Sequence, residues 1–243
     1  MKTSLPVARS MFWNNIPRSL LEDQARVFKH LGIPLVQEPA DKVAHGRWMD
    51  AQIAAADDDD ILVFVDIDAF PVTREAYEKA IEQARQGRVF GLAQTANHLD
   101  NRLQPYAGPM FLAFRKRLWR EVGEPGMTRS SGCDAGQALS IAALQKTVDV
   151  TMVRPTACVQ PKWPLGRQGV FGIGTFYGDN EYFHLFESRL RKNQRIMSAV
   201  ADDIVAGQGL DFGKYLRLSD ESTLLEDLLE TGQRALRRWK RAS

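Results

Sequence analysis

An alternation of strand-like and helix-like segments through the first half of this 243-residue chain most limits the folds open to it. Short apolar runs at residues 33–38, 60–68 and 88–95 are typical of strands, and they alternate with helical periodicity at residues 19–32, 45–56 and 73–87. Thr73 suits a helix N-cap and Gly87 a C-cap. This order predicts an α/β fold, in which helices flank a mostly parallel central sheet.

The second half of the chain continues this pattern less regularly. A strand that turns into a helix is expected at residues 108–123, a helix at 134–147 and an extended segment at 148–155. Dense glycine predicts a loop at residues 166–178, and leucines at helical spacing predict a last amphipathic helix at 220–242. We therefore expect a main domain over residues 1–195 and a helical extension over residues 196–243 packed on it.

Composition excludes several classes of protein. The formal net charge of +2 gives no global field for nucleic acid or membrane, and two cysteines are too few for a disulfide framework. The longest unbroken apolar stretch runs from Ile61 to Val65, far short of a membrane span, and the first residues lack the apolar core of a signal peptide. We expect a cytoplasmic protein without a transmembrane segment.

An acidic pair follows the most apolar strand. Strand alternation predicts that Asp66 and Asp68 point to one side and Ile67 to the other, and Pro71 is expected to stop the strand there. The carboxyl edge of an open α/β sheet binds ligands, and two neighbouring carboxylates suit Mg²⁺ or Mn²⁺. The alternative is a simple loop cap. The preceding run of aspartates, residues 57–60, enters the strand from the opposite end and is expected to be a solvated turn.

This strand with its D-x-D resembles the metal-binding motif of GT-A fold glycosyltransferases, in which the acids hold a divalent metal that bridges the two phosphates of a nucleotide sugar. The stretch "PYAGPMFLAFRKRLWREVGEP" (residues 105–125) resembles the sugar and acceptor side of such sites. The resemblance implies that the sugar or acceptor contacts Tyr106, Gly108, Pro109 and Met110. An ordinary turn and buried strand is the alternative for this stretch.

Two further stretches carry the resemblance. In "GCDAGQALSIAAL", Asp134 matches the general base of inverting GT-A enzymes, while Gln137, also expected on the acceptor side, would complete a capping box with it. In "YGDNEYFHLFESR", His184 matches a late metal ligand, with a buried core histidine as the alternative. Arg189 is expected either to bind the diphosphate of the donor or to pair with Glu187.

The resemblance runs from about Ile33 to Arg189 and lies closest to bacterial and phage sequences of uncharacterised specificity. Only 65 residues precede Asp66, so the nucleotide-binding half is compact. Besides Ile67 and Arg189, the residues expected to bind the donor are Arg9 and Ser10 after the first strand, and His45, Arg47 and Asp50. A place on a helix surface is the alternative for each of these five.

The resemblance implies a metal-dependent enzyme that moves a sugar from a nucleoside-diphosphate sugar, a UDP-sugar first, to an acceptor hydroxyl. A surface glycan or a hydroxymethylated DNA base of the phage type would be the acceptor, and Asp134 as base implies inversion. A haloacid-dehalogenase-like phosphohydrolase and a non-catalytic nucleotide-sugar-binding relative are the alternatives, although the first usually has Thr or Val where this chain has Phe70.

A basic cluster marks the C-terminus. Phospholipid or DNA would suit it, although cations in the last turn of a helix also complement the helix dipole. The cluster comprises Arg234, Arg237, Arg238, Lys240 and Arg241.

Overall fold

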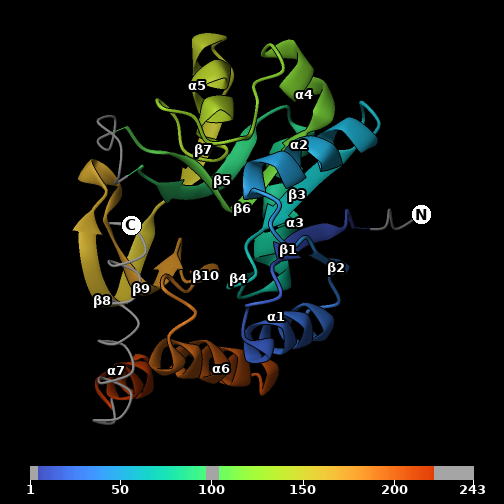
Figure 1. Ribbon diagram of the computed structural model, residues 1–243. Coiled ribbons are helices and arrows are strands. Elements are labelled where there is room, and N and C mark those ends of the chain that lie inside the picture. Colours follow the sequence, from blue (N-terminus) through green and yellow to red (C-terminus); the bar gives the residue numbers. More distant parts are fainter. Residues whose placement is uncertain (1–4, 97–103, 222–243) are drawn as a thin grey trace, which may run out of the picture.

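The computed structural model describes residues 5–96 and 104–221. A six-stranded central sheet has the order β2-β1-β3-β6-β5-β7, and β6 alone runs antiparallel to its neighbours (Figure 1). The predicted α/β fold with a mostly parallel sheet is thus confirmed, and it agrees with the GT-A resemblance. The strands are β1 (Ala8–Phe12), β2 (Leu35–Pro39), β3 (Ile61–Val65), β5 (Val89–Gln94), β6 (Tyr106–Arg115) and β7 (Val150–Val153).

Helices cover both faces of the sheet, and each face has its own apolar cluster. One cluster includes α1 (Arg18–His30) and α3 (Arg74–Arg85). The other includes α2 (His45–Ala55), α4 (Lys116–Glu121) and α5 (Gln137–Gln145). As predicted, the Thr73 hydroxyl caps α3 by accepting a hydrogen bond from the Ala76 N–H. Burial on both faces explains why the central strands are apolar at successive positions.

A second, antiparallel sheet was not predicted. It has the order β4-β10-β9-β8 and packs beside the central sheet (Figure 1). The predicted loop at residues 166–178 is wrong from residue 170 onward, because β9 occupies most of it. A Cβ on Gly172 would lie 1.9 Å from the Gln160 carbonyl oxygen, so glycine here serves the close approach of two strands. The strands are β4 (Ala69–Pro71), β8 (Pro155–Pro164), β9 (Val170–Tyr177) and β10 (Tyr182–His184).

Pro71 does not end the acidic strand, so that expectation is wrong. The strand β3 ends at Val65, and Pro71 is the last residue of β4, an edge strand of the second sheet, opposite Tyr182. Edge strands tolerate proline because one side of their backbone needs no ladder partner.

Two helices follow the second sheet. α6 (Arg191–Val205) packs on α1, where Ser198 donates a hydrogen bond of 2.6 Å to Asp23, and α7 (Phe212–Asp220) packs on β8. The predicted division at residue 195 therefore falls inside α6. Within the described ranges, no helix is long and apolar enough to cross a membrane. The predicted helix at residues 220–242, with its basic cluster, lies almost wholly outside the described residues.

Candidate metal centre and pocket

The D-x-D acids lie in a tight turn between the two sheets. The Ala69 N–H donates to the Asp66 carbonyl at 3.0 Å, and the Asp66 N–H donates to the Met110 carbonyl of β6 at 3.1 Å. Neither Asp66 nor Asp68 is part of a strand. Strand alternation is therefore the wrong reason for their alignment, which the turn and its bond to β6 produce instead.

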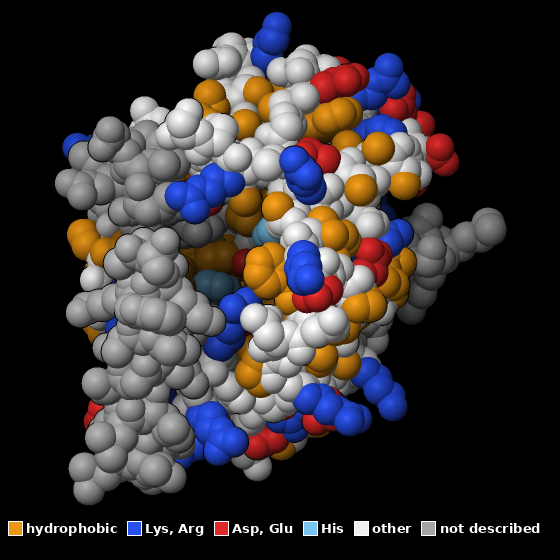
Figure 2. Space-filling model, in the orientation of Figure 1, with side chains coloured by type: hydrophobic (Ala, Val, Ile, Leu, Met, Phe, Trp, Pro, Cys, Tyr) orange, Lys and Arg blue, Asp and Glu red, His pale blue; other side chains and the backbone are white. Residues whose placement is uncertain are grey.

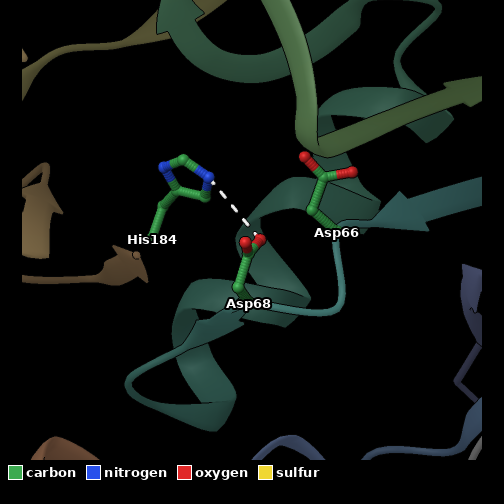
Figure 3. A group of neighbouring side chains, drawn as sticks. All are labelled: Asp66, Asp68 and His184. Carbon is green, nitrogen blue, oxygen red and sulfur yellow. Dashed lines mark ion pairs between the residues drawn. The ribbon is translucent and has the colours of Figure 1, made fainter. Parts of the chain in front are cut away.

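Strand pairing in the second sheet brings His184 to these acids. In the β4–β10 ladder His184 lies opposite Ala69, and the Leu185 N–H donates to the Asp68 carbonyl at 2.9 Å. The His184 Nε2 lies 3.6 Å from the Asp68 Oδ1 (Figure 3). One ligand atom from each of Asp66, Asp68 and His184 lies within 4.8 Å of the others. The three side chains thus converge as the sequence predicted.

The group is suited to a divalent cation. It offers two carboxylates and one imidazole, a mixed oxygen and nitrogen set that fits Mn²⁺ and can fit Mg²⁺. The side chains are shielded, with exposed fractions of 28% for Asp66, 17% for Asp68 and 7% for His184. Burial and then repulsion from Asp68 raise the pKa of Asp66 to about 7, against the attraction of His184. A bound cation would remove this repulsion, which supports the fit.

A second histidine, His45, lies next to Asp66. His45, the first residue of α2, has its Nε2 3.6 Å from the Asp66 Oδ1 and stacks on Trp48 at 5.9 Å between ring centroids. Burial lowers the pKa of His45 to about 4, against the charges of Asp68 and Asp134. His45 is therefore a neutral imidazole at neutral pH, with polar nitrogens but no charge to offer a ligand.

These groups line a pocket of about 250 Å³. The pocket lies at the carboxyl ends of the adjacent strands β1 and β3, where ligands bind in α/β folds, and residues of α2 and of the segment after β10 complete it. Figure 2 shows a hollow in this face with histidine and acidic side chains in its depth. The lining residues are Met11, Phe12, Trp13, Ile16, His45, Asp66, Ile67, Asp68, Ser188 and Arg189.

Arg189 and Trp13 meet at this pocket. The Arg189 guanidinium lies over the Trp13 ring at 5.9 Å from its centroid, and the Trp13 indole N–H donates to the Val43 carbonyl at 2.9 Å. Glu187 pairs instead with Lys162 at 3.7 Å, so the alternative role for Arg189 is not seen. A fixed aromatic face and a fixed cation side by side suit a planar base and a phosphate.

The structure reveals a buried brace that the sequence analysis missed. Gln24 of α1 is fully buried, and its side-chain amide donates to the carbonyls of Asp66 at 2.7 Å and Ala69 at 2.9 Å. The Gln37 side chain donates in turn to the Gln24 oxygen at 3.0 Å. The available signal was a glutamine on the apolar face of a helix, four residues after Leu20. Such a residue is buried, so its amide needs partners.

Four residues predicted to bind the donor lie outside this pocket. Ser10 is fully buried within β1, and its hydroxyl donates to the Val65 carbonyl. Arg9 pairs with Glu38 at 3.1 Å and lines a different pocket. The first strand extends to Phe12, so the segment after it begins at Trp13, later than the sequence indicated.

The other two belong to α2. Arg47 is exposed on its surface. The Asp50 carboxylate accepts from the Met127 N–H at 2.8 Å and from the Thr128 hydroxyl at 3.0 Å. Asp50 therefore anchors a loop, and of the residues predicted to bind the donor the described pocket keeps His45, Ile67 and Arg189.

Asp134 lies just before α5 and contacts β6 through Tyr106. Its Oδ1 accepts from the Ala135 N–H at 2.9 Å, and its Oδ2 accepts from the Tyr106 hydroxyl at 3.2 Å. The Gln137 side chain accepts from the Asp134 N–H at 2.9 Å, which is one half of the predicted capping box. Asp134 does not line the described pocket, but its charge is close enough to raise the pKa values of Asp66 and His45.

The remaining residues predicted to contact sugar are buried in β6. Gly108, Pro109 and Met110 all lie inside this central strand. A Cβ on Gly108 would lie 2.5 Å from the Gln94 side-chain oxygen, so this glycine makes room for another side chain. Close approach of a ligand is therefore the wrong reason for Gly108.

The chain was compared with family models, curated proteins and solved structures. No family model and no curated protein matches the sequence. A protein described as a nucleotide-diphospho-sugar transferase from Desulfovibrio desulfuricans G20 is 12% identical, over 62% of this chain and 80% of that chain, with a TM-score of 0.43. A mannosyltransferase from Pyrobaculum calidifontis, solved with GDP-Man and Mn²⁺, is 12% identical over 97% and 81%, with a TM-score of 0.45.

A third solved structure, mannose-6-phosphate isomerase from Helicobacter pylori, is 12% identical over 49% of this chain and 75% of that chain, with a TM-score of 0.33. All three TM-scores lie below 0.5. Likenesses at this level carry no information about function.

Proposed function

We propose that this chain is a metal-dependent glycosyltransferase, which moves a sugar from a nucleoside-diphosphate sugar to an acceptor hydroxyl. The observation that carries the proposal is the convergence of Asp66, Asp68 and His184 beside a pocket at the carboxyl edge of the sheet. Two carboxylates and an imidazole next to an arginine and an exposed aromatic face suit a diphosphate that is joined to a planar base.

Each group has a separate task in this proposal. Asp66, Asp68 and His184 would hold Mn²⁺ or Mg²⁺, which as a Lewis acid stabilises the charge of a leaving diphosphate. Arg189 binds phosphate oxygens, and Trp13 offers its ring to the base. Asp134 takes the proton of the attacking acceptor hydroxyl. Attack on the face of the sugar opposite the leaving diphosphate gives inversion at the anomeric carbon.

The donor and acceptor are proposed by class. We propose a UDP-sugar as the first donor to test, and a surface glycan or a hydroxymethylated DNA base as the acceptor. The net charge of the whole chain is only +2, so contact with a polyanion would require a local basic surface.

Donor binding tests the proposal first. Thermal shifts are measured with UDP, GDP and ADP, each with Mn²⁺ and with EDTA. We expect one nucleotide to raise the melting temperature by several degrees only with Mn²⁺, since a ligand that binds the folded state stabilises it.

Turnover tests it next, with the sugar donors of the selected nucleotide and water as the acceptor. Release of nucleoside diphosphate and sugar supports the proposal, and release of inorganic phosphate would favour the phosphohydrolase. Binding without turnover, with and without candidate acceptors, would indicate the non-catalytic relative. The Asp68→Asn variant should lose turnover, and Asp58→Asn is the matched control at the other end of β3.

A further inference from the structure

We propose that Tyr106 is a positioning residue for catalysis, which orients the carboxylate of Asp134 toward the reaction and does not touch either substrate. This inference rests on the proposed function, in which Asp134 is the base. It replaces the expectation that Tyr106 contacts the sugar. The carrying contact is the hydrogen bond of 3.2 Å from the Tyr106 hydroxyl to the Asp134 Oδ2.

The burial of Tyr106 decides against direct contact with a ligand. Its side chain is only 1% exposed, at the start of β6, where it lies opposite Gln94 of β5 in the ladder. A sugar or an acceptor cannot reach a hydroxyl that is closed in this way. Its effect on the reaction must therefore pass through Asp134, the one described residue to which it donates.

Among the described residues, the Ala135 N–H and the Tyr106 hydroxyl each donate to one oxygen of the Asp134 carboxylate. The Ala135 N–H is local to the turn, whereas the Tyr106 hydroxyl comes from the central sheet. The next residue of β6 fixes the helix as well, because the Ala107 N–H donates to the Ser140 hydroxyl of α5 at 3.0 Å. The carboxylate is thus tied to the same strand whose Met110 carbonyl holds the D-x-D turn.

The Tyr106 hydroxyl remains a donor at neutral pH. Burial, and then the charge of Asp134, raise the pKa of Tyr106 above its ordinary value. Tyr106 is therefore protonated and neutral, so it donates to the carboxylate without carrying a charge into the site. Without the bond to Tyr106, the Asp134 carboxylate could rotate and lose its alignment with the acceptor hydroxyl. A misplacement of about 1 Å costs up to about 100-fold in rate.

The Tyr106→Phe variant tests the inference, because it removes one oxygen and keeps the buried ring. Hydrolysis is measured with UDP-glucose and GDP-mannose in Mn²⁺, with water as the acceptor. We expect kcat to fall about tenfold, while KM for the donor and the Mn²⁺ affinity stay within about twofold. In an Asp134→Asn background the same change should alter kcat less than about twofold, since its effect passes through that carboxylate.

Tyr77→Phe is the matched control. Tyr77 is also fully buried, and its hydroxyl donates to the Pro6 carbonyl at 2.7 Å, away from the acids. This variant should lose a similar part of the thermal stability and keep the wild-type kcat. If it lowers kcat as much as Tyr106→Phe does, or if Tyr106→Phe keeps the wild-type kcat, the inference is overturned.

The proposed function fails in a different way. If the wild-type chain turns over neither donor, the glycosyltransferase proposal and this inference fall together. Wild-type turnover combined with an unchanged Tyr106→Phe variant overturns the inference alone. Should Tyr106→Phe unfold, 3-fluorotyrosine replaces the tyrosines in the wild type and in the Asp134→Asn variant. The inference predicts a change of kcat in the wild type that is absent in Asp134→Asn, and an unchanged kcat in both proteins would overturn the inference.

Discussion

The two ends of strand β3 carry the same residue type in opposite settings. At the amino end, Asp58 pairs with Arg120 at 2.7 Å and Asp59 with Arg117 at 2.8 Å. At the carboxyl end, Asp66 and Asp68 each have a histidine at 3.6 Å, and no described arginine or lysine forms an ion pair with either. Arginine side chains neutralise the charges of Asp58 and Asp59, whereas Asp66 and Asp68 concentrate negative charge at a pocket. The second arrangement suits a bound cation, as the proposed function requires.

Removal of the unneutralised charge should have the largest effect. We expect Asp68→Asn to lower metal-dependent turnover by about 100-fold or more, because it removes a ligand of the proposed cation. The same variant, without metal, should be at least as stable as the wild type, since Asp68 raises the pKa of Asp66 by repulsion. Steady-state kinetics and thermal melts check the two halves. A fall in stability that matches the loss of activity would contradict this account.

The brace beneath the turn should have the next largest effect. Gln24→Leu removes one donor from each of the Asp66 and Ala69 carbonyls, which we expect to cost about 1–3 kcal/mol of unfolding free energy. It should also lower kcat about tenfold, as changes to groups that orient metal ligands do. Gln37→Leu is the control, because it removes the bonds to the Gln24 oxygen and the Leu21 carbonyl but none to the D-x-D turn. Equal losses of kcat in the two variants would count against a specific role for Gln24.

In the metal-free protein, the aspartates at the two ends of β3 should change the free energy of unfolding with pH in opposite directions. The pKa of Asp66 is raised, so the folded state holds a proton between pH 3.8 and about 7 that the unfolded state has lost. Its contribution therefore falls as the pH rises, and Asp66→Asn should gain on the wild type over this range. Urea unfolding with EDTA at several pH values measures this difference. A constant difference between the two proteins would refute the argument.

Asp58 should show the reverse and smaller effect. Its hydrogen bond to Arg120 lowers the pKa of its carboxyl, so its contribution is present above pH 3.8 and is lost as the pH falls below it. Asp58→Asn should therefore be slightly less stable at neutral pH and equal to the wild type in acid. Turnover should not change. A loss of turnover in this variant would erase the distinction between the two ends of β3.

The sequence was sufficient for the main sheet and for the convergence of Asp66, Asp68 and His184. Apolar periodicity located the central strands, and the D-x-D resemblance selected His184, which lies 116 residues after Asp68. The second sheet was missed because the glycines of β9, which permit close strand contact, look like loop residues. Gln24 and Tyr106 make hydrogen bonds to residues far along the chain, and residue spacing cannot show such contacts.

The contacts proposed for the nucleotide were predicted least well. A short strand has no sharp sequence signal at its end. The prediction ended the first strand before Arg9, whereas β1 ends at Phe12, so the expected donor contacts fell on residues outside the pocket. A later strand boundary would have placed the tryptophan, a residue with a broad aromatic face, at the carboxyl edge where ligands bind.

Binding of Mn²⁺ tests the central claim most directly, because it needs neither donor nor acceptor. Electron paramagnetic resonance counts free Mn²⁺ in titrations of the wild type, His184→Gln and the control Asp58→Asn. The account predicts one site in the wild type and the control, and an affinity at least about tenfold weaker in His184→Gln. Equal affinity in all three proteins, or no binding to the wild type even with a nucleoside diphosphate present, would contradict it.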